Sequence, residues 1–176
     1  PAETARPPVD PVDPGEMVPD ETFIDQDGRA LRLSELRGSN VLLTFIYTRC
    51  PLPDFCPRMD RQFASVQRAV EAGETKHPVR LLSVSFDPDF DTPAVLREHA
   101  ARVGANPRLW KYVTAPRDRV DAFGARLGLD IIRNPKNASD ITHNLRTAVI
   151  DPEGRLVTVF GSDWTPELAL RALAPA

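Results

Sequence analysis

Two apolar runs constrain the fold of this chain more than any other feature. The segments NVLLTFIY (40–47) and VRLLSVSF (79–86) are almost continuously apolar and rich in β-forming residues, as is typical of strands buried on both faces of a sheet. Between them, residues 57–72 carry apolar side chains at helical spacing, and Gly73 follows as a stop signal. A buried strand, a helix and a second buried strand in succession predict an α/β fold.

Hairpin signals near both ends of the chain extend this pattern to a mixed sheet. Two short alternating segments surround Asp27-Gly28, and two more surround residues 151–154. The segment LWKYVT (109–114) predicts a third central strand. We therefore expect a mixed central sheet flanked by helices, with an N-terminal β-hairpin extension. Further helices are expected after a cap at Asp91 or Thr92, over residues 117–127, and after a cap at Thr165.

The composition predicts one globular domain behind a proline-rich segment. The chain has 176 residues, of which 41% are hydrophobic, enough for one good core. Residues 1–19 are rich in proline and lack apolar residues at packing intervals, so we expect a flexible linker there and the domain over residues 20–176. A chain that begins with a linker is expected to have lost a cleaved signal, a lipid anchor, a membrane helix or a fused domain.

The charge and hydropathy patterns argue against two functional classes. The net charge is −3 and the basic residues are scattered along the chain, which does not suit a nucleic-acid-binding surface. No apolar run in the sequence reaches the length of a membrane-spanning helix.

Both cysteines, Cys50 and Cys56, lie in the short segment YTRCPLPDFCP (47–57). Cys50 follows the first buried strand, at the edge where the sites of open α/β sheets gather. The prolines between the cysteines, and a six-residue step that does not match the helical repeat, predict a loop over residues 51–55. Cys56 immediately precedes the predicted helix, and we expect the positive helix end to make it the more acidic thiol.

Three interpretations of this cysteine pair remain open on the residues alone. A disulfide would staple the loop of an exported protein, although a bridge that closes so short a loop adds little stability. A redox-active dithiol would exchange with the cysteines of a partner. A soft-metal site would use both thiolates, which suit Cu(I) especially well, whereas Zn(II) would need further ligands.

Three histidines are candidates for a third ligand of such a site. His77 lies in a polar loop and is expected to be solvated. His99 lies among apolar residues on a predicted helix, where a half-buried helical histidine is more common than a metal ligand. His143 lies in NASDITHNLRTAVID (137–151), a polar loop that leads directly into an apolar strand. That loop would bring an imidazole over the cysteine loop.

Three longer motifs follow one another along the chain: VLLTFIYTRCPLPDFCPRMDRQF (41–63), SVSFDPDFDTPAVLREHA (83–100) and THNLRTAVIDPEGRLV (142–157). Together they resemble the Sco/SenC family of thioredoxin-like copper proteins, in the family's order and over residues 20–176. In that family two cysteines and one distant histidine bind copper, and the domain helps to assemble the binuclear copper centre of respiratory cytochrome oxidases.

The resemblance implies a set of site residues in this chain. By position the copper ligands are Cys50, Cys56 and His143, and Asp87 lies near the copper site with a role in handover. The chain departs from the family in one respect, because five residues, PLPDF, stand between the cysteines where the family has three. This insertion keeps both sulfur ligands but changes the geometry of the site and the ease of disulfide formation.

The resemblance also implies a function. A copper metallochaperone would hold Cu(I) or Cu(II) and deliver it by ligand exchange to the copper-accepting subunit of a cytochrome c oxidase. The same thiols would serve a thiol–disulfide reductase acting on partner cysteines, or a copper or redox sensor, and the sequence leaves these alternatives open. We expect a monomer with no nucleic-acid partner. We also expect an extracytoplasmic location, such as the bacterial periplasm, with membrane attachment only through a missing N-terminal anchor.

Overall fold

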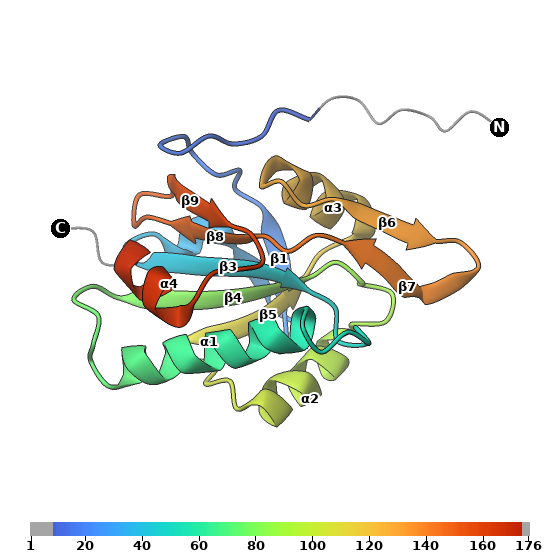
Figure 1. Ribbon diagram of the computed structural model, residues 1–176, viewed down its shortest axis with the longest axis horizontal. Helices are drawn as coiled ribbons and strands as arrows, with labels where there is room; N and C mark the ends of the chain where they lie inside the picture. Colours follow the sequence, from blue (N-terminus) through green and yellow to red (C-terminus); the bar gives the residue numbers. More distant parts are fainter. Residues whose placement is uncertain (1–8, 174–176) are drawn as a thin grey trace.

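The two long apolar runs of the sequence form adjacent parallel strands at the centre of a seven-stranded sheet (Figure 1). The structure, a computed structural model, describes residues 9–173. Strand β3 (Asn40–Ile46) pairs with β4 (Val79–Ser85), and β4 pairs with β5 (Trp110–Thr114), all in parallel. The strand order is β2-β1-β5-β4-β3-β8-β9, and β1 and β8 run antiparallel to their central neighbours. The predicted mixed sheet is therefore confirmed, with outer strands β1 (Thr22–Asp25), β2 (Ala30–Arg32), β8 (Thr147–Ile150) and β9 (Leu156–Phe160).

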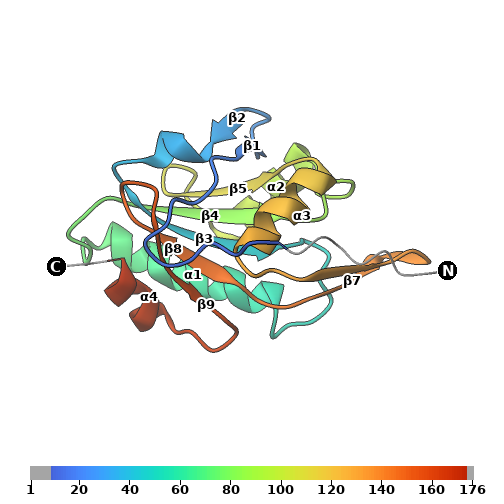
Figure 2. The same cartoon turned by 90° about the horizontal axis from the view of Figure 1, so that it is seen from above.

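Helices cover both faces of the sheet, which explains why every residue of β3 is buried. Helices α1 (Cys56–Glu71) and α2 (Pro93–Val103) lie on one face, and α3 (Arg117–Arg126) lies on the other (Figures 1 and 2). Helix α4 (Pro166–Ala172) packs beside α1, and a short 3-10 helix (Leu33–Leu36) follows β2. This layering is that of the predicted α/β sandwich.

The predicted helix starts are confirmed at two threonines. Thr92 caps α2, and its hydroxyl oxygen accepts a hydrogen bond from the backbone N–H of Val95 at 3.4 Å. Thr165 caps α4 in the same way, accepting from Leu168 at 3.3 Å. In both helices a proline occupies the first turn, where its missing N–H leaves no intrahelical bond unmade.

Residues 9–19, the described part of the proline-rich N-terminal segment, pack against the domain. Val12 and Val18 are buried in the core. The N–H of Val12 donates to the carbonyl of Arg126 at 2.8 Å, and that of Val18 donates to a carbonyl in the β8–β9 turn at 3.0 Å. The expectation of an unpacked linker is therefore wrong for these residues, while residues 1–8 lie outside the described part.

A second correction concerns the polar stretch before β8, which was expected to be a loop. Residues 137–143 form strand β7 (Asn137–His143), which pairs antiparallel with β6 (Ile131–Asn134). This β6–β7 hairpin is a separate two-stranded sheet that projects beyond the main sheet (Figure 1). Most of its side chains are exposed or half-buried, so it lacks the apolar periodicity by which a strand is recognised in sequence.

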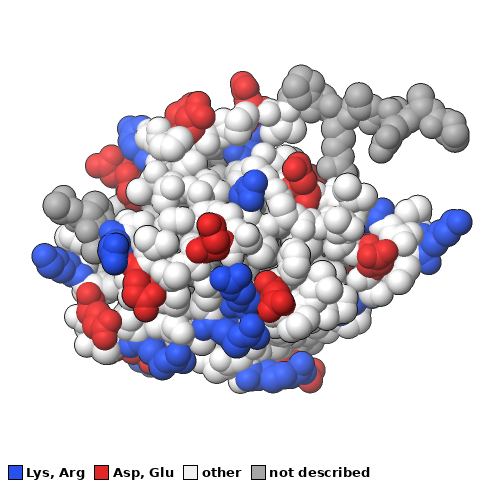
Figure 3. Space-filling model, in the orientation of Figure 1, with Lys and Arg blue, Asp and Glu red and all other residues white. Residues whose placement is uncertain are grey.

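Among the described residues, no helix combines the length and the apolar character needed to cross a bilayer. Acidic and basic side chains are interspersed on the face drawn in Figure 3, with no field of one sign there. This agrees with the scattered charges of the sequence.

Candidate metal centre

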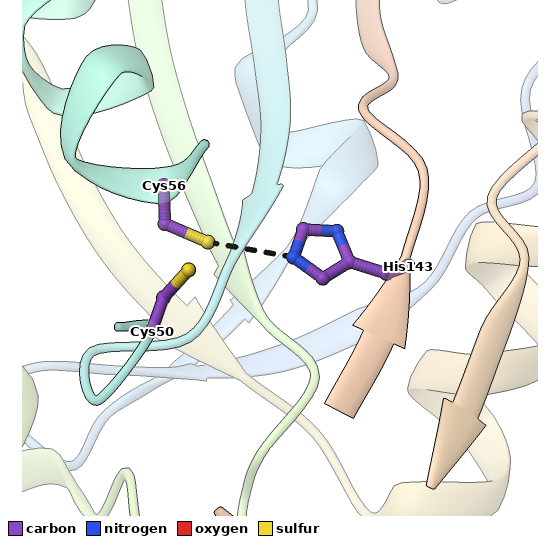
Figure 4. A group of neighbouring side chains, drawn as sticks. All are labelled: Cys50, Cys56 and His143. Atoms are coloured by element: carbon purple, nitrogen blue, oxygen red, sulfur yellow. Dashed lines mark hydrogen bonds between the residues drawn. The ribbon is translucent and has the colours of Figure 1, made fainter. Parts of the chain in front are cut away.

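Three side chains from two distant parts of the chain converge at one edge of the sheet (Figure 4). Cys50 lies in the loop that follows β3, Cys56 is the first residue of α1, and His143 is the last residue of β7. Their potential ligand atoms all lie within 4.8 Å of one another, and Cys56 Sγ is 3.7 Å from His143 Nε2. The structure thus brings together the three residues that the sequence singled out.

The cysteine loop is held in place at its start by a buried carboxylate. Asp91, which is fully buried, accepts hydrogen bonds from the backbone N–H of Thr48 at 3.1 Å and from the hydroxyl group of Thr48. The Asp91 carboxylate also accepts a hydrogen bond, at 2.5 Å, from the hydroxyl of Ser85, the last residue of β4. Burial raises the pKa of Asp91, and these donors oppose that shift. The loop therefore leaves the sheet in a defined direction, and residues 51–55 continue without helix or strand as predicted.

The histidine ring is oriented by one hydrogen bond and by aromatic packing. Nδ1 of His143 lies 2.7 Å from the carbonyl oxygen of Asn144, and a carbonyl can only accept, so Nδ1 carries the proton. In the neutral ring this leaves the lone pair on Nε2, directed at the sulfurs. The ring packs against Tyr47, Phe55 and Phe86, with centroid distances of 5.7, 5.9 and 4.8 Å. The imidazole is thus presented in the tautomer that a metal requires.

The two thiols differ in acidity, in the opposite sense to the expectation from sequence. A hydrogen bond from Cys56 is the main cause that lowers the pKa of Cys50 to about 4, and His143 lowers it further. Burial is the main cause that raises the pKa of Cys56 above its ordinary value, and the neighbouring Cys50 raises this pKa further. The prediction that Cys56 is the more acidic thiol is wrong, because desolvation of a buried thiolate outweighs the attraction of the helix end.

Asp87, expected near the site, is engaged by an arginine of the cysteine segment. Arg49 Nε lies 2.8 Å from Asp87 Oδ2, and Nη2 lies 3.3 Å from Oδ1. Asp87 is almost completely buried, whereas the Arg49 side chain is about a quarter exposed. The Asp87 carboxylate therefore balances the positive charge of Arg49, which directly precedes Cys50. A role of Asp87 in the transfer of copper to a partner stays a proposal.

The other two histidines lie apart from this centre, as the sequence predicted. His77 is exposed in the connection before β4. His99 is half-buried on α2, where Nε2 lies 2.8 Å from Asp60 Oδ2 and the ring packs edge-on against Tyr112. Neither belongs to the one group of at least three potential metal ligands found among residues 9–173.

Sequence reasoning missed two residues that tie the cysteine segment to β7. The hydroxyl of Tyr47 donates to the carbonyl of Ile141 at 3.4 Å, and Arg49 Nη2 donates to the carbonyl of Ala138 at 3.1 Å. Their partners are backbone carbonyls of a strand that was not predicted, so no pairing signal existed in the sequence. The nearest available signal was their position beside Cys50, at the end of a buried strand.

The donor set is that of a soft-metal centre. Two sulfurs and one imidazole nitrogen suit copper, and three protein ligands leave room for a further ligand from outside. The sulfurs also lie close together although five residues separate Cys50 and Cys56, so the longer loop does not disperse them. The same proximity allows dithiol chemistry.

Comparison with known proteins shows the family of this chain. The sequence model described as SCO1/SenC matches residues 10–176. The chain belongs to the SCO1/SenC family. A SCO2-like protein of Rickettsia felis is 33% identical over 159 residues, covering 84% of this chain and 71% of the relative.

Solved structures of Sco proteins share the fold. A SCO1/SenC family lipoprotein from Bacillus anthracis superposes with a TM-score of 0.80 at 20% identity, covering 91% of this chain and 95% of the other. BsSco, described as a Sco-family cytochrome c oxidase assembly protein with a disulfide switch, gives 0.75 at 25% identity, covering 92% and 94%. Bradyrhizobium japonicum ScoI, solved with copper bound, gives 0.71 at 24% identity, covering 90% and 98%. The fold expected from the resemblance, that of Sco thioredoxin-like proteins, is confirmed.

Proposed function

We propose that this Sco protein binds one copper ion through Cys50 Sγ, Cys56 Sγ and His143 Nε2. The observation that carries this proposal is the convergence of these three atoms within 4.8 Å of one another. Membership of a family in which a structure has been solved with copper bound supports the choice of metal. The softness of two thiolates favours copper over magnesium or calcium, which prefer oxygen ligands.

The proposed role is delivery of this copper to the copper-accepting subunit of a cytochrome c oxidase, for its binuclear centre. Three protein ligands leave a position at which a donor atom of the acceptor enters before a ligand of this chain departs. Transfer by ligand exchange then needs no free ion. Cys50 is the more exposed of the two cysteines, so the acceptor would approach from its side. With this role we propose a location outside the cytoplasm and a membrane tether through a segment preceding the domain.

A second candidate function, thiol–disulfide reductase, is favoured by the acidity of Cys50. Its pKa near 4 keeps it as a thiolate at neutral pH, and the thiolate is the attacking species. Cys50 would attack the disulfide of a partner, forming a mixed disulfide and releasing one partner thiolate. Cys56 would then attack Cys50, which releases the second partner thiolate and leaves Cys50 and Cys56 oxidised. Copper binding and this reaction compete, because both use the same two sulfurs.

Anaerobic titration of the reduced protein with Cu(I), followed by a transfer assay, tests the primary proposal. We expect one copper per reduced chain, far weaker binding by the oxidised chain, and transfer to an apo acceptor domain that carries a binuclear copper motif. Tight binding without transfer would favour a copper sensor. Weak binding together with fast reduction of a model disulfide would favour the reductase.

A further inference from the structure

The β6–β7 hairpin, which carries His143, has little apolar packing of its own. From residue 132 to residue 140 no side chain is buried, and the hairpin contributes buried residues only near its base, at Ile131 and Ile141. A register shift interrupts the pairing between Arg133 and Asn134. A short hairpin of this kind is only marginally stable without contacts to the rest of the domain.

A pocket lies between this hairpin and the start of the cysteine loop. It is lined on one side by Arg49 and Asp87, and on the other by the β6–β7 hairpin at Asn134, Pro135 and Ala138. Side chains therefore do not fill the space between the two segments. Across it, Arg49 Nη2 donates to the carbonyl of Ala138 at 3.1 Å.

The Arg49 guanidinium contacts three residues at once, two in the turn after β4 and one in β7. It pairs with Asp87 through Nε and Nη2, its plane lies over the Phe90 ring with Cζ 4.4 Å from the centroid, and Nη2 reaches β7 at Ala138. Only a planar fork with several donors can make these contacts together, whereas a lysine offers a single charged centre. Since Arg49 directly precedes Cys50, this group joins the loop of one sulfur to the strand of the imidazole.

A second contact from the same segment acts on the same strand. The Tyr47 hydroxyl donates to the carbonyl of Ile141, three residues beyond Ala138 on β7. The cysteine segment thus holds β7 at two points, and His143 lies two residues beyond the second. A displacement of β7 at Ala138 would be passed along the strand to the ring.

We infer that Arg49 is a positioning residue, which holds the β6–β7 hairpin against the cysteine loop and so keeps His143 Nε2 within reach of the two sulfurs. This assignment rests on the proposed copper site for its functional meaning, but the structural link itself is independent of copper. Without Arg49 the two cysteines remain in place, and the centre changes from three preset ligands to two.

Arg49→Met tests this inference, because methionine keeps an unbranched stem and removes the guanidinium. Hydrogen exchange of the metal-free, reduced protein is followed by mass spectrometry in peptides covering residues 137–143 and β4. We expect exchange in residues 137–143 to rise on the order of tenfold while β4 is unchanged. We also expect Cu(I) affinity, measured by competition with a chromophoric chelator, to fall by roughly 10–100-fold, as for loss of a residue that orients a ligand.

Two further variants make the result specific. Arg117→Met is the matched control. Arg117 lines the same pocket and pairs with Asp89, another carboxylate of that pocket. It should leave both readouts at the wild-type value. Arg49→Lys keeps the charge beside Asp87 but loses the fork, so hairpin exchange should still rise.

Several results would overturn the inference. These are unchanged exchange at residues 137–143 in Arg49→Met, an equal rise in β4, an equal effect of Arg117→Met, or wild-type behaviour of Arg49→Lys. Failure of the proposed function is seen separately, as a wild-type protein that binds no copper. In that case the exchange measurements still decide whether Arg49 holds the hairpin.

Discussion

Cys56 Sγ lies 3.7 Å from His143 Nε2, although 87 positions of sequence separate the two residues. The sulfur is fixed at the first position of α1, and the nitrogen is fixed at the end of β7 by the bond between Nδ1 and the Asn144 carbonyl. Cys50 Sγ lies within 4.8 Å of both atoms. The centre is therefore preorganised, and its members should respond to mutation as one unit.

Replacement of either cysteine should remove most copper binding. Cys50→Ser and Cys56→Ser each exchange a soft anionic ligand for a hard neutral hydroxyl. We expect Cu(I) affinity to fall by more than the roughly 10–100-fold that is typical of losing a supporting residue. Competition titration under anaerobic conditions measures this, and tight binding retained by both single variants would refute the site.

Replacement of His143 should separate copper binding from thiol chemistry. His143→Ala removes one ligand, so Cu(I) affinity should fall by more than about tenfold, while the rate of reduction of a model disulfide stays within a few-fold of wild type. His99→Ala is the control, because His99 pairs with Asp60 on the α1–α2 side and does not reach the sulfurs. A large loss in His99→Ala with none in His143→Ala would contradict the arrangement described.

The acidity of Cys50 should be visible in its alkylation. Because its folded pKa is about 4, below its ordinary value, its thiolate is lost only as pH falls through about 4. The rate of iodoacetamide modification at Cys50 should therefore be constant from neutral pH down to about pH 5, while Cys56 should remain unreactive there because its pKa is raised. Peptide mass spectrometry assigns the modified residue.

The Cys56→Ala variant provides the control for this profile. It removes the thiol whose hydrogen bond is the main cause of the low pKa of Cys50, so the alkylation midpoint should move to higher pH. An unchanged midpoint would show that another group sets the acidity. Preferential modification of Cys56 at pH 5 would contradict the burial of its sulfur.

The docked part of the N-terminal segment should contribute to stability. Val12→Ala and Val18→Ala each remove methyl groups from the core, and each should lower the free energy of unfolding by about 1–2 kcal/mol, part of the value of a buried valine. Val9→Ala is the matched control, because Val9 is exposed. Denaturant unfolding measures these differences, and equal stability of all three variants would show that the segment does not hold to the domain.

The sequence predicted the central sheet correctly because its strands are buried on both faces. In β3 every residue is buried, so the apolar run marks the strand unambiguously. In β7 only Ile141 is buried, and the strand is held by backbone pairing with β6 and by donors from Tyr47 and Arg49. Backbone pairing leaves no periodic trace in side-chain chemistry, which is why a loop was expected there.

The sequence predicted which three residues meet, but not the relative acidity of the two thiols. The motifs around Cys50, Cys56 and His143 indicated which residues would meet. The relative acidity of the thiols depends on which sulfur the fold buries, and Cys56 is the buried one. Burial depends on how α1 and the loop before it pack against the rest of the domain, which cannot be read from local spacing.

The separation of the ligands along the chain also has a consequence during synthesis. Chains emerge from the ribosome N-terminus first, so Cys50 and Cys56 appear together while the 87 positions to His143 are still to be made. For that interval the nascent polypeptide presents the two thiols without the imidazole of His143. Until the last third of the chain has folded back onto the sheet, the two sulfurs lack the imidazole that lies beside them in the folded domain.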